Sequence, residues 1–429
     1  MDTSPHLNQP YVLNTVRVNS SISRRIWEIQ KYADFSAGGF LRLESSLQSL
    51  FKHTRDALIF NVLSSYQRTI HDITIPGLLD QVTTRSKMSN TTSQVKSWIH
   101  TKAGYPQSLS LSTTDVPAAP SPSALLIQVH AAALNPVDIQ LMNFPLNSLP
   151  YLDGPKIPAR DFSGTVLAAG SKTEFEKGDE IYGVSLAMNG TGALTEVAHI
   201  DTNGACIVKK PKHLSWQQAA SLPLVYLTAR MSIEKCKPFL KAPTPSENRL
   251  VVLGGSSATG IYTVQIAKSL GWTVLSSCSG RNIDFVKGLG AAEVVDYTTS
   301  LNAVVAAVKK FSPGAIIDCV GGTETIGLAA QYVTIVGDKT SRASLGGSAL
   351  YLTHPRMVLR WLLGYLGVVN SYECITLEPR KEWLEETTKL EPEKNVFIDS
   401  IFEFCRGKEA FERLNTGRAR GKVVVNIRS

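Results

Sequence analysis

The stretch from Val251 to Lys268 constrains this 429-residue chain more than any other. An apolar run, Leu250 to Leu253, has the length of a buried parallel strand. A glycine- and serine-rich turn follows, and Gly271 later stands where the C-terminal cap of a helix belongs. Between the turn and that cap, apolar residues recur about every three positions, at Ile261, Val264, Ala267 and Leu270. The pattern predicts a strand, a tight turn and a helix.

Such a turn can hold a phosphate group, because the free N–H groups and the dipole at a helix N-terminus face an anion. Small residues also let the backbone approach a pyrophosphate closely. Ser257 and Ala258 stand where further glycines often occur, so ordinary α/β punctuation is the competing interpretation. The candidate cofactor-binding residues of this turn are Gly254, Gly255, Ser256, Ser257, Ala258, Thr259 and Gly260.

The end of the next predicted strand, Trp272 to Cys278, indicates which cofactor is bound. Folds selective for NAD usually place an acidic residue about 20 residues after the turn, where it binds the ribose 2′-hydroxyl. Here no acidic residue lies between the glycine turn and Asp284, and Ser279 and Arg281 follow directly on the end of the strand. A hydroxyl and a guanidinium suit a 2′-phosphate, so the sequence predicts NADPH. The alternative is a solvated turn with an incidental arginine.

Strands and helices continue to alternate after this point, which is typical of a doubly wound parallel sheet. Helices are expected at Phe285–Leu289 and Leu301–Phe311, and strands at Glu293–Tyr297, Ala315–Val320 and Tyr332–Val336. Ligands of such sheets bind beyond the carboxyl ends of the strands. One crevice is therefore expected to contain Ser279, Tyr297, Cys319, Gly321 and Gly337.

Composition excludes several classes of protein. The net charge of +8 is spread along the chain without an aromatic-rich basic stripe, so we expect no nucleic acid partner. Short basic clusters at 209–212 and 418–422 are interpreted as solvated faces or phosphate-side contacts. Six cysteines without a Cys-x-x-Cys pair give neither a disulfide framework nor a zinc knuckle, which favours a cytoplasmic location. No apolar run reaches about 18 residues, so no spanning membrane segment is expected.

The region from 1 to 87 lacks the strand rhythm of the rest and predicts a helical or disordered extension. Three interpretations stay open: a partner-binding extension, a transit segment that would make the protein mitochondrial, and a part outside the mature fold. The most apolar stretch, Met357 to Val369, contains Arg360 and is too short to span a bilayer. A pocket-covering or subunit-contact helix is favoured there over a helix on a membrane surface.

From Gln94 onward, short strands with turns between them predict a small barrel-like domain. Its expected strands are Ala124–His130, Gly164–Ala168, Glu180–Val184 and Leu194–Ile200. A helix over Trp216–Glu234 should lead into the nucleotide domain, and the last segment should return to the first domain. The expected domains are therefore 88–222 for the barrel, 223–370 for the nucleotide fold and 371–429 for the return.

Six blocks in order carry a family resemblance. They are Ala131–Asp138 with its Asn-Pro-x-Asp turn, Arg160–Val166, Gly178–Gly183, Ala220–Ala229, Asp296–Tyr297 and Gly417–Val424. With these blocks, the chain from about 88 to 429 resembles the medium-chain dehydrogenase/reductase superfamily. Within it, the chain is similar to the zinc-free quinone oxidoreductase branch of zeta-crystallin-like and reticulon-interacting-protein-like members, especially fungal ones.

The resemblance implies an α/β fold with a GroES-like β-barrel catalytic domain, a Rossmann domain and, here, an N-terminal helical extension. It implies that Thr228 contacts the nicotinamide side, and that Asn135 and Asp138 line the cleft near the transferred hydride. Ser279, Arg281 and Tyr297 would surround the 2′-phosphate. The resemblance also implies dimers or tetramers formed through the nucleotide domain, and a homodimer is expected.

The sequence departs from the zinc-dependent relatives. Those enzymes hold zinc with Cys, His and Cys or Glu ligands, whereas Asn135 to Asp138 offers no thiolate and Arg160 stands where a His-Glu pair would begin. A catalytic zinc needs about three protein ligands, so we expect no metal. Gln140 stands where many members of the branch have a tyrosine, so a tyrosine relay is not carried over to that position.

Without zinc, alcohol oxidation lacks its Lewis acid. The predicted reaction is hydride transfer from NADPH to a small-molecule quinone or α,β-unsaturated carbonyl, which needs mainly orientation and a dry cleft. Negative charge would develop on the substrate oxygen, so a donor is required. Asn135, Tyr182, Thr228 and ordered water all stay open as that donor, and Asp138 completes the candidate catalytic set. Alternatives are a non-catalytic assembly factor that interacts with membranes or partners, and an enoyl reductase acting in trans.

Overall fold

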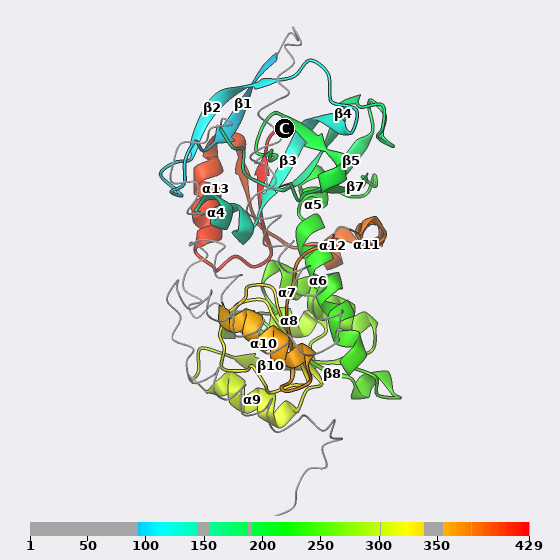
Figure 1. Ribbon diagram of the computed structural model, residues 1–429, viewed down its shortest axis with the longest axis vertical. Helices are drawn as coiled ribbons and strands as arrows, with labels where there is room; N and C mark the ends of the chain where they lie inside the picture. The colour runs from blue at the N-terminus through cyan, green and yellow to red at the C-terminus, as the bar shows by residue number, and fades with distance from the viewer. Residues whose placement is uncertain are drawn as a thin grey trace, which may run out of the picture. The chain divides into compact units, whose positions relative to one another are not determined.

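The computed structural model describes residues 93–143, 155–187, 191–300, 302–338, 355–378 and 380–428 (Figure 1). The chain divides into two units between Met88 and Ser89, and the second unit contains everything described below. The extension expected at 1–87 lies outside the described residues.

A six-stranded parallel sheet forms the nucleotide-binding half of this unit. The strands lie in the spatial order β10 (Glu293–Asp296), β9 (Thr273–Cys278), β8 (Arg249–Leu253), β11 (Ala315–Asp318), β12 (Gln331–Thr334) and β13 (Ser371–Cys374). Counted along the chain, this is the order 3-2-1-4-5-6 of a dinucleotide-binding fold, in which the strand order reverses between β8 and β11. The doubly wound sheet expected from the sequence is confirmed.

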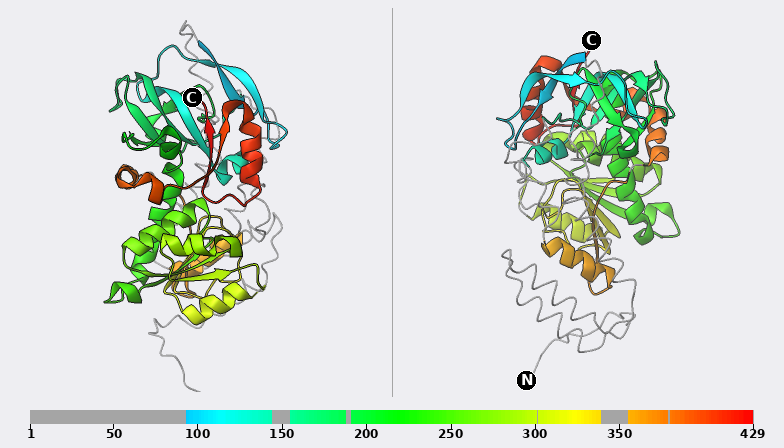
Figure 2. Two further views of the ribbon diagram at one scale, coloured as in Figure 1. Left: turned by 180° about the vertical axis from the view of Figure 1, so that it is seen from behind. Right: turned by 45° about the horizontal axis from the view of Figure 1, so that its top comes forward.

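Helices cover both faces of this sheet (Figure 2). Alternate residues of a strand point to opposite sides, and in β8 the residues on both sides are apolar and buried. Leu250 and Val252 belong to one hydrophobic cluster, whereas Val251 and Leu253 belong to another. The first cluster takes in residues of α6 (Pro223–Cys236), α7 (Ala258–Ser269) and α8 (Ile283–Leu289). The second takes in residues of α9 (Ala303–Phe311) and α10 (Pro355–Tyr365).

Two of the differences from expectation affect how the chain enters and leaves the nucleotide-binding half. The predicted helix over Trp216–Glu234 is two helices, α5 (Trp216–Ala220) and α6, separated at Ser221 and Leu222. Pro223 begins α6 because proline has no N–H to donate and its ring clashes with a preceding helical turn. The parallel sheet also continues through β13, past the predicted domain boundary at 370.

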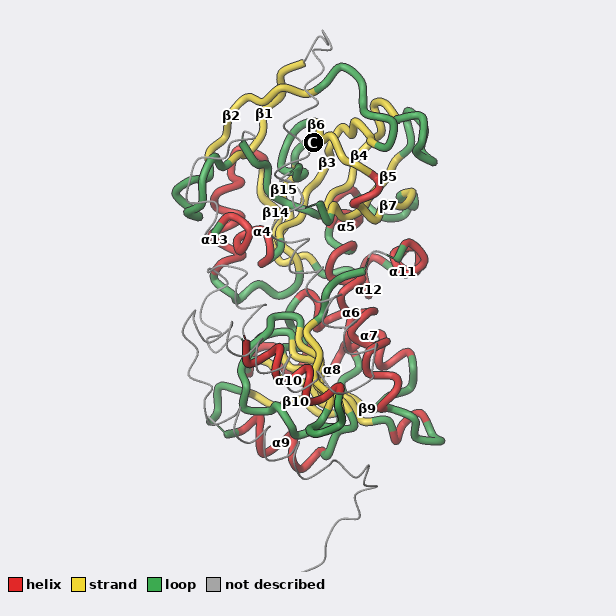
Figure 3. Tube along the Cα trace, in the orientation of Figure 1, coloured by secondary structure: helices red, strands yellow, loops and turns green. Residues whose placement is uncertain are grey.

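A seven-stranded sheet forms the other half. Its order is β14 (Ile398–Glu403), β15 (Lys422–Asn426), β3 (Ala124–Leu134), β4 (Asp161–Ala169), β5 (Glu180–Ser185) and β7 (Ala205–Lys209), with β6 (Val197–Asp201) also paired to β3. The end of the chain thus completes a sheet that begins near residue 124 (Figure 3). A separate hairpin consists of β1 (Ser93–Ile99) and β2 (Ser110–Val116).

Four further helices accompany this sheet. They are α4 (Pro136–Met142), α11 (Lys381–Glu386), α12 (Pro392–Asn395) and α13 (Gly407–Asn415). The apolar stretch noted around Met357 forms α10, whose buried Met357 packs in the cluster that contains Val251 and Leu253. Across the described ranges, no helix combines the length and apolar character needed to cross a bilayer.

Candidate active site

The glycine turn lies at the carboxyl end of β8, where the strand order of the parallel sheet reverses. Gly254 adopts a φ of +83°, in the left-handed region that favours glycine. Its N–H donates to Ser277 Oγ at 3.0 Å and to the Ser277 carbonyl at 3.1 Å, which fastens the turn to β9. Ser257 caps α7, since its Oγ accepts a hydrogen bond from the Gly260 N–H at 3.1 Å. The first turn of α7 is therefore held in place at the sheet edge.

Three glycines of the turn have no room for a side chain. A Cβ on Gly254 would lie 2.2 Å from Val320 Cγ1, and one on Gly255 would lie 2.1 Å from Ser276 Oγ. A Cβ on Gly260 would lie 2.2 Å from the Gly254 carbonyl oxygen. The turn is therefore as compact as a close approach to a pyrophosphate requires.

The other predicted cofactor residues follow the ends of neighbouring strands. Ser279 follows β9, Tyr297 follows β10, and Gly321 lies just beyond β11. Gly337 lies three residues beyond β12. Because all these strands are parallel, the structure places the residues along one edge of the sheet, as the sequence predicted. Tyr297 is 46% exposed and accessible from solvent.

Asn282 connects the glycine turn to the end of β9. Its Nδ2 donates to Ser256 Oγ at 3.2 Å and to Ser279 Oγ at 3.3 Å. Asp296 lies at the end of the neighbouring strand, and its carboxylate accepts hydrogen bonds from Thr298 and from the Gly280 N–H. These hydrogen bonds lower the pKa of the Asp296 carboxyl group. Sequence reasoning missed this carboxylate because it comes from a strand that is adjacent only in space.

A basic hollow of about 700 Å³ opens beside Arg281 and Asn282. It is lined by four arginines and one carboxylate: Arg281, Arg413, Arg418, Arg420 and Asp399, with Asn282 and Thr416. The Asp399 carboxylate accepts two hydrogen bonds from Arg413, at 2.7 and 2.8 Å, and a third from the Arg420 N–H at 2.8 Å. Arg413 is thus neutralised locally, whereas Arg281, Arg418 and Arg420 give the hollow its positive charge.

The basic segment near the C-terminus reaches the glycine turn directly. Gly421 forms a parallel β-bridge with Ser257, the residue that caps α7. Gly421 has a φ of +95°, and a Cβ there would lie 2.3 Å from the Phe397 carbonyl oxygen. Of the two interpretations open for the cluster 418–422, the phosphate-side one fits this placement.

A buried polar network lies next to this bridge. Asn135 is the N-terminal cap residue of α4, and its Nδ2 donates to Asp161 Oδ2 at 2.9 Å. Lys422 forms an ion pair with the same Asp161 oxygen at 2.8 Å and also donates to Asn135 Oδ1. All three side chains are at most 3% exposed. Nothing in the local sequence signals Lys422, because Asn135 lies 287 residues earlier.

Asp138 and Arg160 extend this network. The Asn135 N–H donates to Asp138 Oδ2 at 2.7 Å. Burial raises the pKa of Asp138 to about 6, while the charge of Arg160 opposes that rise. Burial lowers the pKa of Arg160, which nearby Asp138 and Asp161 counteract. The cations of Arg160 and Lys422 and the two carboxyl groups thus share one desolvated region.

Thr228 is tied to the same network through the backbone. The Leu224 N–H donates to Asp161 Oδ1 at 2.9 Å, and Thr228 Oγ1 donates to the Leu224 carbonyl at 2.6 Å. The first turns of α6 are therefore anchored to the carboxylate that Asn135 and Lys422 share.

Tyr182 is not brought together with these residues. It is fully buried on β5, and its hydroxyl lies 2.6 Å from Thr387 Oγ1 in a one-turn segment after α11. Burial raises the pKa of Tyr182 to about 12. Its hydroxyl is therefore hydrogen-bonded to the segment after α11.

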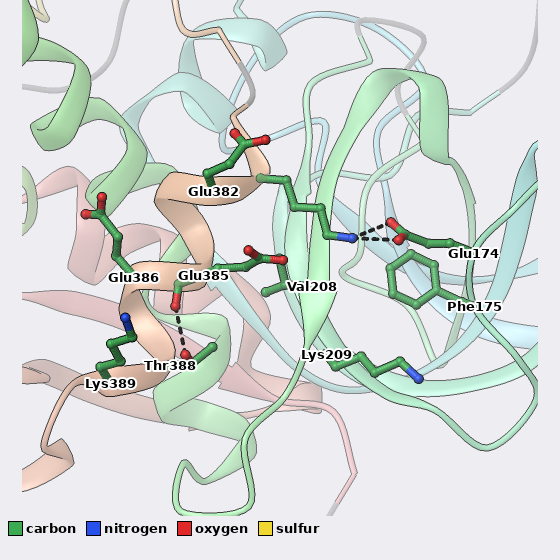
Figure 4. Close-up of a pocket in the computed structure, with 10 residues that line it drawn as sticks. Glu174, Phe175, Val208, Lys209, Glu382, Glu385, Glu386, Thr388 and Lys389 are labelled. Atoms are coloured by element: carbon green, nitrogen blue, oxygen red, sulfur yellow. Dashed lines mark hydrogen bonds and ion pairs between the residues drawn. The ribbon is translucent and has the colours of Figure 1, made fainter.

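A second hollow of about 620 Å³ lies between α11 and the loop that follows β4 (Figure 4). It contains none of the predicted site residues. Its lining mixes glutamates with lysines: Glu174, Phe175, Val208, Lys209, Lys381, Glu382, Glu385, Glu386, Thr388 and Lys389. Lys381 Nζ lies 2.6 Å from both Glu174 oxygens, so charges of opposite sign pair across this hollow.

Metal ligands do not gather in the parts of the chain that the structure describes. There, no group of three His, Cys, Asp or Glu side chains is placed to hold an ion.

Comparison with known proteins agrees with this architecture. The family described as alcohol dehydrogenase GroES-like domain matches residues 121–212, and the family described as zinc-binding dehydrogenase matches residues 289–425. A mitochondrial NAD(P)H oxidoreductase of Mus musculus is 32% identical over 331 residues, covering 71% of this chain and 82% of the relative. A chloroplastic quinone-oxidoreductase homolog of Spinacia oleracea is 28% identical over 317 residues, covering 72% and 92%.

Among solved structures, the quinone oxidoreductase from Coxiella burnetii superposes with a TM-score of 0.64 at 26% identity, covering 78% of this chain and all of that one. The fold, the glycine turn at the strand reversal and these likenesses agree. The chain is thus a member of the medium-chain dehydrogenase/reductase superfamily of oxidoreductases, among its quinone oxidoreductase-like members.

Proposed function

We propose that this protein is a zinc-independent reductase that transfers a hydride from NADPH to a quinone or an α,β-unsaturated carbonyl compound. The observation that carries the proposal is the glycine turn, which has a basic hollow on one side and the buried Asn135 network on the other. The spinach and Coxiella relatives are both named as quinone oxidoreductases or their homologues, which supports the substrate class.

The choice of NADPH rests on charge. The turn and the N-terminus of α7 would hold the pyrophosphate, since helix N-termini bind anions. The 2′-phosphate would then enter the basic hollow, where Arg281, Arg418 and Arg420 outnumber the single carboxylate, which is already bound by Arg413. Arginine binds phosphate well because its planar guanidinium can donate two parallel hydrogen bonds. NADH would bring no phosphate to pair with these three charges.

The bound cofactor supplies the hydride, and the chain supplies orientation, a dry environment and a donor for the substrate oxygen. Among the candidate donors, the hydroxyls of Tyr182 and Thr228 make short contacts with Thr387 and the Leu224 carbonyl. Asn135 Nδ2 is bound firmly only to Asp161, since its other contact, to the Ala133 carbonyl, is 3.5 Å long. We therefore favour Asn135 as the donor; Thr228 on α6 is linked to it through Leu224 and Asp161.

Zinc independence is supported by the charges already present. The cations of Arg160 and Lys422 lie among Asp138 and Asp161, so the carboxylates there are already compensated. A divalent ion would have to displace a buried ammonium or guanidinium. Metal analysis of the purified protein should find far less than one zinc per chain, and a stoichiometric zinc required for turnover would contradict this part of the proposal.

The decisive experiment is a titration of the purified chain with NADPH and NADH, followed by turnover with a panel of quinones and enones. Preferential binding of NADPH together with turnover is the expected result. Preference for NADH would refute the cofactor assignment. Binding without turnover would instead favour an assembly factor that interacts with membranes or partners, and turnover only of carrier-bound enoyl chains would favour the enoyl reductase alternative.

For the location, we favour the mitochondrial alternative over the cytoplasmic expectation. The mouse relative is described as mitochondrial and the spinach relative as chloroplastic, so relatives of this kind are found in organelles. Microscopy of the full chain with a C-terminal fluorescent tag should show mitochondrial signal, and a diffuse cytoplasmic signal would contradict it.

A further inference from the structure

Lys422 has an unusual position for a lysine, because its side chain is only 3% exposed. Its ammonium group meets three acceptors: Asp161 Oδ2 at 2.8 Å, the Leu134 carbonyl at 3.0 Å and Asn135 Oδ1. An ammonium has three N–H donors, so each of them is used. Lysine is almost never buried unless it is paired in this way.

The contact with Lys422 fixes the orientation of the Asn135 carboxamide. The amide oxygen faces the ammonium, and the amide nitrogen faces the Asp161 carboxylate at 2.9 Å. A flipped amide would place its N–H₂ against the ammonium and its oxygen against the carboxylate, so both contacts would become repulsive. Lys422 and Asp161 together therefore allow one orientation of the amide.

Lys422 is also bound to the cofactor side through the backbone. The preceding residue, Gly421, forms a β-bridge with Ser257, which caps α7 at the glycine turn. One residue of this segment thus touches the predicted phosphate cradle, and the next touches the Asn135 network. The segment from Gly417 to Lys422 physically joins the two halves of the candidate active site.

We propose that Lys422 is a positioning residue for hydride transfer, which holds the Asn135 amide in register with a cofactor bound at the glycine turn. This inference rests on the proposed function, since it needs NADPH at the turn. It predicts that Lys422 affects the rate of the chemical step through Asn135 and has little effect on cofactor affinity. A purely structural role as a buried ion pair would affect stability and leave the rate of the folded enzyme unchanged.

The test needs a variant that folds. Lys422→Met alone would leave Asp161 as an unpaired buried carboxylate, which is strongly destabilising. The double variant K422M/D161N removes both charges at similar volume, and replacing a buried pair in this way is often close to neutral for stability. We expect its Tm to stay within about 3 °C of the parent. K408M, the same change at an exposed lysine of α13, is the matched control.

Three measurements on this variant decide the question. The dissociation constant for NADPH should stay close to that of the parent, while kcat should fall about 10- to 100-fold because a misplaced group costs that much in rate. Without any cofactor, the Asn135 side-chain ¹⁵N–¹H signals, identified by their loss in Asn135→Ala, should move towards the positions of an unrestrained side-chain amide. The two protons stay distinct in both cases, because rotation about an amide C–N bond is slow. K408M should match the parent in all three.

A double-mutant cycle separates positioning from independent effects. In an Asn135→Ala background, K422M/D161N should lower kcat no further, because the group it positions is already gone. Losses that multiply, an unchanged kcat in the folded variant, or an undisturbed Asn135 signal would each overturn the positioning role alone. A parent chain that binds NADPH but reduces neither quinone nor enone would refute the proposed function, and the positioning role would fall with it.

Discussion

Removal of positive charge from the basic hollow should convert the protein from an NADPH binder to one that no longer distinguishes NADPH from NADH. The perturbation is Arg281→Ala, alone and combined with Arg418→Ala. Both guanidinium groups line the hollow beside the glycine turn, and Asp399, the single carboxylate there, is already bound to Arg413. Neither substitution therefore leaves a buried carboxylate unpaired, and folding should be unaffected.

The expected magnitude follows from one charge-assisted hydrogen bond per arginine. Such a bond contributes about 1.5 kcal/mol or more, and a loss of 1.4 kcal/mol is tenfold in a dissociation constant. Arg281→Ala should weaken NADPH binding about tenfold, and the double variant about a hundredfold if the two sites act independently. NADH binding should change less than about twofold, since NADH carries no 2′-phosphate to lose a contact.

Isothermal titration calorimetry at two salt concentrations is the assay, because exposed charges are screened by salt. Arg380→Ala, an exposed arginine outside the hollow, is the control and should bind NADPH as the parent does. The preference of the parent for NADPH should shrink at the higher salt concentration. Equal weakening of NADPH and NADH in Arg281→Ala would show that this arginine serves another part of the cofactor, and would refute the reasoning.

Three further predictions follow from the geometry. Gly260→Ala should abolish cofactor binding and lower Tm, because its Cβ would lie 2.2 Å from the Gly254 carbonyl oxygen. A folded variant that still binds NADPH by calorimetry would contradict this prediction. Burial raises the pKa of Asp138 to about 6, so the parent loses stability as the pH rises from about 4 to 6. Asp138→Asn has no such loss, so the difference in Tm between the variant and the parent should grow in favour of the variant across that window and stay constant above it. A homodimer is expected through the nucleotide domain, where β13 is an edge strand and Val368 and Val369 are each 44% exposed. Charged substitutions of these two valines should give a monomer by analytical ultracentrifugation. A parent that is already monomeric would contradict the expectation.

Local patterns in the sequence predicted the elements whose cause is local. The run around Val251 gave a strand, a turn and a helix because apolar period, glycine content and the cap at Ser257 all act within a few residues. The break between α5 and α6 had an equally local cause in Pro223, which the helical periodicity of that stretch concealed.

Contacts between distant segments could not be predicted in the same way. Lys422 meets Asn135 across 287 residues, and Arg418 lines the same hollow as Arg281 although the two are far apart in the sequence. Tyr182 looked like a donor because its block matches the family, yet its hydroxyl contacts Thr387, 205 residues later. Such placements depend on the sheet order, which no local pattern encodes.

The place of β15 between β14 and β3 has a consequence for synthesis of the protein. The parallel sheet uses strands from Arg249 to Cys374, so it can form before the chain is finished. The seven-stranded sheet is completed later, because β15, which separates β14 from β3, becomes available only when residues 422–426 have left the ribosome. A stop codon just before Gly417 would therefore remove one neighbour of β3, the bridge to Ser257 and the cation beside Asp161 together. Loss of the segment from residue 417 onward should therefore damage both the sheet and the candidate active site.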